Sequence, residues 1–427
     1  MDRIYYSFNI RYGGYIMKSK KISKMISPVL GIMSFMLVMG GMTVPAFAEE
    51  TKSDNVAVEE TAKTDYATYI NSTTEKSGFK LTLSKFTASK NKITVTATIE
   101  CPRAIDDDTL KNSIFSMTLK KSDCEFDRGI TKKINDKTFE ITFDAVSFKG
   151  IPESADLRFD VILPQFNLNG WVNANVDLTK NYDKIIEKDI LISNDKSRLT
   201  YNKFESDVLG TTIYASRAEN NENSNYDEEY SGYDSKILLK CDDKYYELDD
   251  NNFYHDYDGN NSSESFTSKS VTYDDIYNAE SVSIIPVLCT LKNKDIDEIY
   301  SSFSYDEIVR ETTDNVEYEK KFEFADGKDG EISKIERNGN KIKVYCSADS
   351  EKKSILMAIG IYGWSKSDEG NFAGHATKVI YKNPDDLTGY IVEFGNVDEN
   401  AAFSMYSDKE ILGHSDNFEF VQETKIK

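Results

Sequence analysis

Residues 78–100 read GFKLTLSKFTASKNKITVTATIE, and this stretch decides the fold. Apolar and polar residues alternate over residues 79–84, which is the pattern of a β-strand with one buried face. Phe86 is out of phase with the alternation, so we expect a β-bulge near Lys85. After a short polar turn, the alternation resumes over residues 93–99. The stretch therefore predicts a β-hairpin.

Two further copies of this hairpin follow. The second spans residues 198–216, and its Lys203 stands 118 residues after Lys85. The third spans residues 332–346, and its Lys334 stands a further 131 residues along. An interval of roughly 100–150 residues is the size of one globular domain and is too long for a solenoid repeat. The copies predict three domains, with a chance recurrence of similar hairpins in a β-rich chain as the alternative.

The remaining segments also favour strands. Polar turns separate short apolar runs, residues 355–361 among them, and only residues 295–309 are a good helix candidate. Residues 159–164 and 282–286 share a pattern that ends in proline, and we interpret them as the same strand in consecutive domains. We predict an all-β chain of three tandem immunoglobulin-like β-sandwich domains after a signal peptide. The predicted domain bounds are residues 66–189, 190–316 and 317–427.

The N-terminus has the features of an export signal. Four lysines precede an apolar run that ends in the A-x-A cleavage motif of residues 46–48. We predict a signal peptide over residues 1–48, within which residues 1–16 have no evident role, and a flexible linker over residues 49–65. An uncleaved anchor is the alternative, because residues 25–44 approach the length of a membrane span.

Charge narrows the range of partners. The chain carries 52 basic and 73 acidic side chains, and loss of residues 1–48, which hold six basic residues and one acidic residue, leaves a net charge of −26. Nucleic acid is disfavoured, since its recognition needs clustered Lys and Arg. We expect a secreted, extracellular chain with no membrane span after cleavage. Its expected partner is a cell-envelope component or an extracellular protein.

The five cysteines are divided two, two and one among the predicted domains. Disulfides Cys101–Cys124 and Cys241–Cys289 are therefore candidates, and each would contribute roughly 2–4 kcal/mol where geometry permits. Reduced thiols are the alternative. Cys346 aligns with a small inward-facing residue of the other two hairpins, so we expect it to be a buried packing residue.

Catalytic motifs are absent from the sequence. Only three histidines occur, and there is no HExxH, GxSxG or glycine-rich phosphate loop. We therefore predict no catalytic residue and no enzyme. Asp256, Asp258 and Asn260 offer side-chain oxygens at alternate positions of one loop, as calcium requires, although the EF-hand template fails. Tyrosines of the acidic loops are candidate binding residues, because exposed tyrosines often anchor interfaces: Tyr226, Tyr230, Tyr233, Tyr254 and Tyr257.

Several segments resemble a known family. The extracytoplasmic region of the DUF4179 proteins of Firmicutes is similar to residues 66–71, 78–83 and 93–99. The immunoglobulin-like domain that often follows in such proteins is similar to Trp171, residues 199–204 and the turn of residues 242–244. The resemblance implies an extracytoplasmic β-sandwich and supplies no catalytic residue. Family members commonly carry a segment similar to an anti-sigma factor and one membrane span where this chain has a signal peptide, so regulation of a sigma factor is not implied.

These observations predict a secreted, non-catalytic bacterial protein that binds or senses a component of the cell surface through its loops. Two alternatives stay open. One is a hydrolase of envelope glycans, because a pair of catalytic carboxylates has no sequence motif. The other is a structural spacer. A hydrolase requires close acids in a cleft, whereas a spacer requires no site at all.

Overall fold

The computed structural model describes residues 65–427, except residues 121, 123, 148, 195–198, 219–234, 255–260, 303–308, 366–375, 398 and 400. Residues 65–427 form one compact unit. Almost all of its strand pairs are antiparallel and its helices are short, so the predicted all-β fold built of sandwiches is confirmed. The predicted signal peptide, residues 1–48, and all but the last residue of the predicted linker lie outside the described residues.

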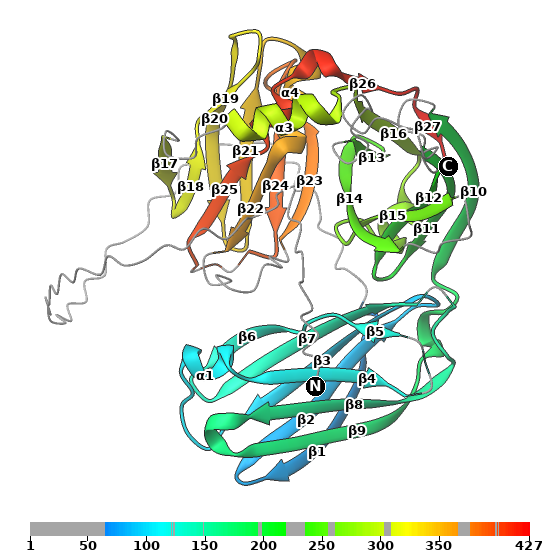
Figure 1. The fold of residues 1–427 in the computed structure, drawn as a ribbon, viewed down its shortest axis with the longest axis vertical. Coiled ribbons are helices and arrows are strands. Elements are labelled where there is room, and N and C mark those ends of the chain that lie inside the picture. The colour runs from blue at the N-terminus through cyan, green and yellow to red at the C-terminus, as the bar shows by residue number, and fades with distance from the viewer. Residues whose placement is uncertain are drawn as a thin grey trace, which may run out of the picture. The chain divides into compact units, whose positions relative to one another are not determined.

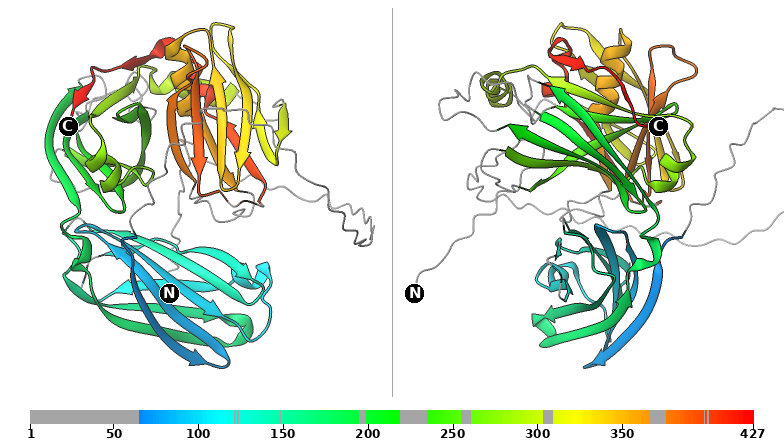
Figure 2. Two further views of the ribbon diagram at one scale, coloured as in Figure 1. Left: turned by 180° about the vertical axis from the view of Figure 1, so that it is seen from behind. Right: turned by 90° about the vertical axis from the view of Figure 1, so that its right-hand side faces the viewer.

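Module 1 is a β-sandwich of nine strands (Figure 1; Figure 2). Its elements are β1 (Thr68–Lys76), β2 (Phe79–Ala88), β3 (Lys92–Glu100), α1 (Asp107–Lys111), β4 (Ile114–Leu119), β5 (Glu125–Phe126), β6 (Ile130–Asn135), β7 (Thr138–Val146), β8 (Ser154–Leu163), η1 (Pro164–Phe166), β9 (Leu168–Asp177) and η2 (Thr179–Asn181). One sheet has the order β1-β2-β3-β7-β5, with β6 also on β7, and the other has the order β4-β8-β9. The apolar faces of the two sheets meet in one core that includes Phe79, Phe143 and Phe159.

Module 2 follows, with seven strands among its described residues. Its elements are β10 (Ile185–Asn194), β11 (Leu199–Asp207), β12 (Gly210–Ala218), β13 (Lys236–Cys241), β14 (Lys244–Tyr254), β15 (Asn261–Ser268), α2 (Tyr273–Asn278) and β16 (Val282–Cys289). The first half of β14 pairs with β13 and its second half pairs with β15, so this strand joins both sheets of the module. The core includes Tyr201, Phe204 and Phe266.

Module 3 contains the remaining elements, which begin with a helix. They are α3 (Asn293–Ser302), β17 (Arg310–Thr313), β18 (Val316–Glu319), β19 (Lys321–Glu323), β20 (Asp329–Asn338), β21 (Lys341–Ser347), α4 (Glu351–Gly360), β22 (Ile361–Ser365), β23 (Thr377–Lys382), β24 (Tyr390–Gly395), β25 (Phe403–Ser407), α5 (Lys409–Leu412), η6 (Ser415–Asn417), β26 (Phe418–Phe420) and β27 (Thr424–Lys425). Helix α3 confirms the predicted helix over residues 295–302; of the rest of the predicted range, residues 303–308 lie outside the described part of the chain. One sheet has the order β19-β20-β21-β24-β23, and the other has the order β17-β18-β25-β22.

The three predicted hairpins are β2–β3, β11–β12 and β20–β21, and all are antiparallel. In each first strand the register shifts directly before the repeated lysine: between Leu83 and Lys85, between Tyr201 and Lys203, and between Ile332 and Lys334. The bulge expected near Lys85 is confirmed, and it recurs at the same place in every copy. Because one extra residue reverses the alternation, it returns Phe86 to the buried face.

The modules also share the strands that follow each hairpin. Apart from the two-residue strand β5, which lies between β4 and β6, four strands come next in each module: β4, β6, β7 and β8; β13, β14, β15 and β16; and β22, β23, β24 and β25. In each set the second and third strands pair, the first and fourth pair, and the third also pairs with the second strand of the hairpin. The same pairing three times supports duplication of a whole module. It also places residues 159–163 and 282–286 in β8 and β16, which occupy equivalent positions.

Residues 355–361 do not form the strand expected from their apolar run. They belong mostly to α4, whose residues 353–360 are all buried and which contacts β20, β21 and β24. A helix segment surrounded by protein needs no polar face, so residues 355–360 carry no polar side chain and show no helical period. Ser350 begins the helix, because its side chain accepts a hydrogen bond from the Lys353 backbone N–H.

Backbone pairing crosses the predicted boundary between residues 316 and 317. Strand β14 of module 2 pairs with β23 of module 3, and β26 and β27 pair with β16. The result is a sheet of 14 strands that contains parts of both modules. The core of module 3 likewise includes Leu238, Val287 and Cys289 of module 2. Modules 2 and 3 are therefore joined much more closely than separate domains on a flexible chain would be.

Candidate functional site

The sequence-based binding residues fall mainly in loops beyond the described part of the chain. Asp256, Asp258 and Asn260, the candidate calcium ligands, lie outside the described residues, and so do Tyr226, Tyr230, Tyr233 and Tyr257. Tyr254 ends β14, but its side chain is also outside the description. Within the described residues, no group of three His, Cys, Asp or Glu side chains is arranged to hold a metal ion.

Neither candidate disulfide forms in the structure, because the two cysteines of each pair are separated by the length of a strand. Cys101 lies beside Lys137, just before β7, whereas Cys124 precedes β5, which pairs with the far end of β7. Cys241 pairs with Val282 at the start of β16, and Cys289 ends that strand. At about 3.3 Å per residue, seven residues span roughly 20 Å. A disulfide requires Cα atoms within about 7 Å of each other.

Cys346 is the packing residue that the hairpin alignment predicts. Its register partner is Ile332, just as Ala97 pairs with Leu83 and Ala215 with Tyr201. The side chain is buried, and burial raises the pKa of its thiol to about 12. A thiol in this environment stays protonated near neutral pH and is a poor nucleophile.

A buried charged cluster links the turn of the first hairpin to the second hairpin. Glu205 and Asp207 are both fully buried on β11. The Ser89 hydroxyl donates to Asp207 at 2.9 Å, and the Asn91 amide donates to Glu205 at 3.0 Å. The Lys92 Nζ lies 3.3 Å from Asp207. Every buried carboxylate of this cluster therefore has a module 1 partner, and we interpret the cluster as a structural joint.

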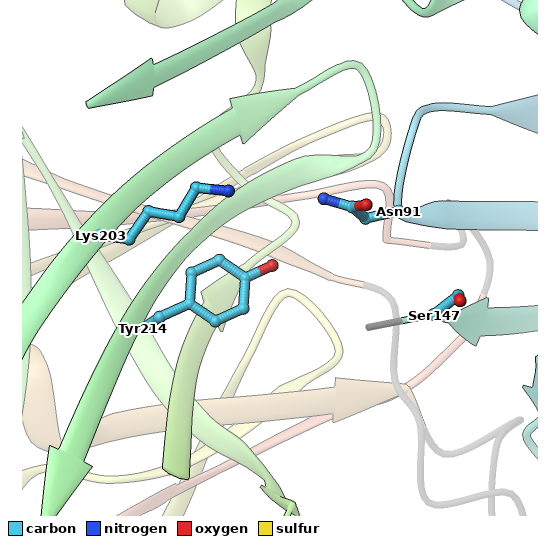
Figure 3. A pocket seen from close by; sticks show the side chains of 4 residues that line it. All are labelled: Asn91, Ser147, Lys203 and Tyr214. Carbon is cyan, nitrogen blue, oxygen red and sulfur yellow. The ribbon is translucent and has the colours of Figure 1, made fainter. Parts of the chain in front are cut away.

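A small pocket of about 130 Å³ opens beside this joint. Figure 3 shows the Lys203 and Tyr214 side chains on neighbouring strands, facing Asn91 and Ser147. The Lys203 Nζ is already bound by Glu187 at 2.7 Å and by Glu205 at 2.9 Å. A pocket of this size is far below the usual 300–1,000 Å³ of a small-molecule site. Because the Lys203 ammonium is also already paired with two carboxylates, this pocket is a poor candidate for ligand binding.

A second buried cluster lies where modules 2 and 3 share their sheet. The Glu247 carboxylate accepts from the Lys378 Nζ at 2.8 Å and from the Tyr362 hydroxyl at 2.9 Å, and the Lys236 Nζ lies 3.7 Å away. Burial alone would raise the pKa of Glu247, but the two lysines outweigh it and hold the pKa below its ordinary value. The carboxylate is ionised and paired, so it is unsuited to act as a general acid at neutral pH.

The outer face of the sheet β4-β8-β9 is the one described surface that gathers large exposed apolar side chains on adjacent strands. Ile114 and Ile162 are direct cross-strand partners and are 56% and 37% exposed. Trp171 is 46% exposed and is the partner of Asp160, two residues from Ile162. Diagonal neighbours of this kind lie within reach of a long side chain. The three side chains thus form a continuous apolar patch.

Charged and polar groups surround this patch. The Arg158 guanidinium lies 5.0 Å from the centre of the Trp171 ring, and the Lys76 Nζ lies 5.5 Å from it. Arg158 also makes a bidentate pair with Asp160, which holds the guanidinium in place. The exposed side chains next along the strands are polar: Ser116, Thr118, Asn169, Asn173 and Asn175. An apolar centre with a polar rim is typical of a protein recognition surface.

The sequence carries a signal for this surface in the phase of β9. In β9, Leu168, Val172 and Val176 mark the buried phase of the strand. Trp171 falls in the opposite phase, so it must face outward. A large aromatic residue on the polar face of an otherwise regular strand indicates a contact surface more directly than tyrosines in acidic loops do.

Comparisons with known proteins give little beyond this geometry. No protein-family model and no curated protein matches the chain. Among solved structures, the crystal structure of the conserved domain protein from Bacillus anthracis matches 52% of this chain and 78% of its own, at 16% identity and a TM-score of 0.41. The resemblance to DUF4179 proteins stays a prediction. None of the helices in the described residues is long and apolar enough to cross a membrane.

Proposed function

We propose that this chain is an exported, non-catalytic recognition protein of the bacterial surface, which binds another protein through the outer face of β4-β8-β9. The observation that carries the proposal is the contiguous exposure of Ile114, Ile162 and Trp171 on that face. The predicted signal peptide supports an extracellular location. Relative to the sequence-based expectation, the proposal moves recognition from the loops of module 2 to a sheet face of module 1.

The composition of the face favours a polypeptide partner over a sugar. A sugar ring stacks on an open aromatic face, but cations lie over the Trp171 ring within 5.0 and 5.5 Å of its centre. The neighbouring Ile114 and Ile162 offer only apolar contact, which suits the side chains of a protein more than hydroxyl groups. Trp and Arg side by side are also the residues most enriched in interface hot spots.

Two substitutions test the surface without disturbing the core. Trp171→Ala and Ile162→Lys alter only outward-facing side chains of β9 and β8. Leu387→Lys is the matched control, because Leu387 is 95% exposed and lies in the turn between β23 and β24. The chain without its predicted signal peptide is immobilised and incubated with envelope and extracellular fractions of the producing cell. The proposal expects one protein that wild type and Leu387→Lys retain and that both surface variants lose, with affinity reduced at least about 30-fold for Trp171→Ala.

Pretreatment of the fractions identifies the chemistry of the partner. Protease digestion is expected to abolish retention, whereas periodate oxidation of sugars is expected to leave it intact. The reverse pattern would assign the face to a glycan and overturn the choice of partner. Equal retention by all four chains would show that this face binds nothing in the fractions, and the recognition proposal would fail.

A further inference from the structure

Strand β16 has one edge that its own module leaves open. In module 1 the equivalent strand β8 pairs with β4 on one edge and with β9 on the other, and β9 follows β8 directly. In module 2, β16 pairs with β13 on one edge, but the next described element is α3, which leads into module 3. Among the described residues, the second edge of β16 is occupied only by residues 418–427, which follow the last strand of the two module 3 sheets, β25. We call these residues the closing segment.

Backbone hydrogen bonds hold the closing segment in antiparallel register. The Val421 N–H donates to the Pro286 carbonyl at 2.9 Å, and the Ile426 N–H donates to the Val282 carbonyl at 2.7 Å. The Val282 N–H donates in return to the Lys427 carbonyl at 3.2 Å. Pro286 has no N–H, which explains why pairing is interrupted there and the segment divides into β26 and β27.

Side chains make the site selective for this sequence. Phe418 and Ile426 are buried at opposite ends of the segment, Phe418 in the core of module 3 and Ile426 in the core of module 2. Between them the Glu423 carboxylate accepts a hydrogen bond from the Ser283 hydroxyl and lies 3.4 Å from the Lys240 Nζ. A strand that fits must therefore place two apolar side chains and one acid at these spacings, which resembles recognition by strand addition.

We propose that β16 is a strand-acceptor site and that the closing segment of a second copy of this chain can occupy it, so that two copies exchange segments reciprocally. The exchanged segment would make the same contacts as the native one, so the site itself does not distinguish the two chains. The native arrangement is favoured only because the closing segment is covalently attached to the same chain as its site. A short connection of this kind gives the segment an effective concentration on the order of millimolar at the site. Exchange is therefore expected when copies refold together at concentrations near that value.

Cysteine pairs in full chains test the exchange. Ser283 and Lys425 are direct cross-strand partners, so cysteines at these positions are close enough for a disulfide. One preparation carries Ser283→Cys and a second, with a different tag, carries Lys425→Cys. The two are refolded together across a range of concentrations and then oxidised. The control pairs Ser283→Cys with Lys321→Cys, an exposed position on β19. The five native cysteines are buried and should not compete.

The proposal expects a covalent dimer that carries both tags and whose yield rises with concentration for the first pair alone. In one chain, the double variant Ser283→Cys, Lys425→Cys is expected to form the internal disulfide and to remain monomeric. Equal dimer yields from the test and control pairs would overturn the proposal, since random collision would then explain the product. Absence of a mixed dimer at millimolar concentration, while the double variant closes its internal bond, would overturn it as well.

Discussion

Tyr201 places one unsatisfied polar atom, its hydroxyl oxygen, in an otherwise apolar core. The ring is fully buried in the core of module 2 and packs edge-on against Phe266, with ring centres 5.9 Å apart. Its hydroxyl, however, has no hydrogen-bond partner among the residues that the structure describes. The alternation of apolar residues predicts that this position faces inward, but the absence of a partner depends on atoms of other strands. No local pattern in the sequence can reveal it.

Tyr201→Phe is expected to stabilise the protein. The substitution keeps the ring and removes the hydroxyl, which loses its hydration on folding and gains no hydrogen bond in return. The free energy of unfolding should therefore rise by about 1 kcal/mol. Tyr182→Phe is the matched control of opposite sign, because the Tyr182 hydroxyl donates to the carbonyls of Ile151 and Pro152. Urea denaturation of both variants checks the pair. A destabilised Tyr201→Phe would mean that its hydroxyl is bound in solution.

Glu410 is expected to make stability depend on pH. Burial, together with the carboxylates of Asp408 and Glu319, raises its pKa to about 7, while Lys409 opposes the shift. The unfolded chain ionises this group near pH 4.5, so the folded state binds the proton more tightly between pH 4.5 and 7. The contribution of Glu410 to the free energy of unfolding therefore falls across that window as the pH rises, and it is lost above pH 7.

Glu410→Gln removes this dependence. Below pH 4.5 the Glu410 site should contribute equally to the stability of the variant and of wild type. Above pH 7 the variant should be more stable by about 2 kcal/mol, which is less than the full pKa shift implies because Glu410 is partly exposed and solvent screens its charge. Thermal unfolding of both chains between pH 4 and 8 measures the difference. A difference that stays constant across the range would contradict the raised pKa, whatever its size.

At the scale of elements, local patterns predict the hairpins well and helix α4 of module 3 poorly. The period of two, the out-of-phase Phe86 and the repeated lysine are properties of adjacent residues, so the three hairpins and the bulge near Lys85 can be predicted from the sequence. Residues 355–361 lack any period because α4 is buried on all sides. Their type is decided by the sheets around them, which the local sequence does not describe.

Strand register explains why the predicted disulfides failed. Counting cysteines per domain assumes that residues of one sandwich are close, but a strand is long compared with a disulfide. Cys101 and Cys124 lie near opposite ends of β7, and Cys241 and Cys289 lie at opposite ends of β16. Pairing depends on which residues are opposite each other, and that is set by contacts between distant strands. By contrast, the buried position of Cys346 could be predicted, because the register within a hairpin is the same in all three copies.

At the scale of the whole molecule, the sequence repeat predicts three modules but not how they are joined. Each copy of the hairpin organises its own core, as the repeat implies. The shared sheet of modules 2 and 3 arises instead from β14 with β23 and from the closing segment with β16. The outward-facing patch around Trp171 can be predicted only in part. The alternation in β9 shows that Trp171 faces outward, but its neighbours Ile114 and Ile162 come from other strands.

The shared sheet and the buried Glu247 cluster predict that modules 2 and 3 unfold together. Lys378→Met removes the closest cation from the buried Glu247 carboxylate, which then keeps Lys236 at 3.7 Å and the Tyr362 hydroxyl at 2.9 Å. Loss of one partner from a buried ion pair typically costs 3–5 kcal/mol, and the remaining lysine should hold the loss to about 3 kcal/mol. Lys321→Met is the control, because its pair with Asp329 is exposed and should contribute less than about 1 kcal/mol.

Hydrogen exchange read by mass spectrometry distinguishes local from coupled unfolding in this variant. If the modules unfold as one, Lys378→Met should speed exchange in the cores of both modules by the same factor, from β11 and β12 to β21 and β24, because they share one opening reaction. Strands β3 and β7 of module 1 should keep their wild-type rates. Faster exchange confined to module 3 would show that the shared sheet breaks at β14 and β23 before the modules open. The two cores would then be independent despite their continuous backbone pairing.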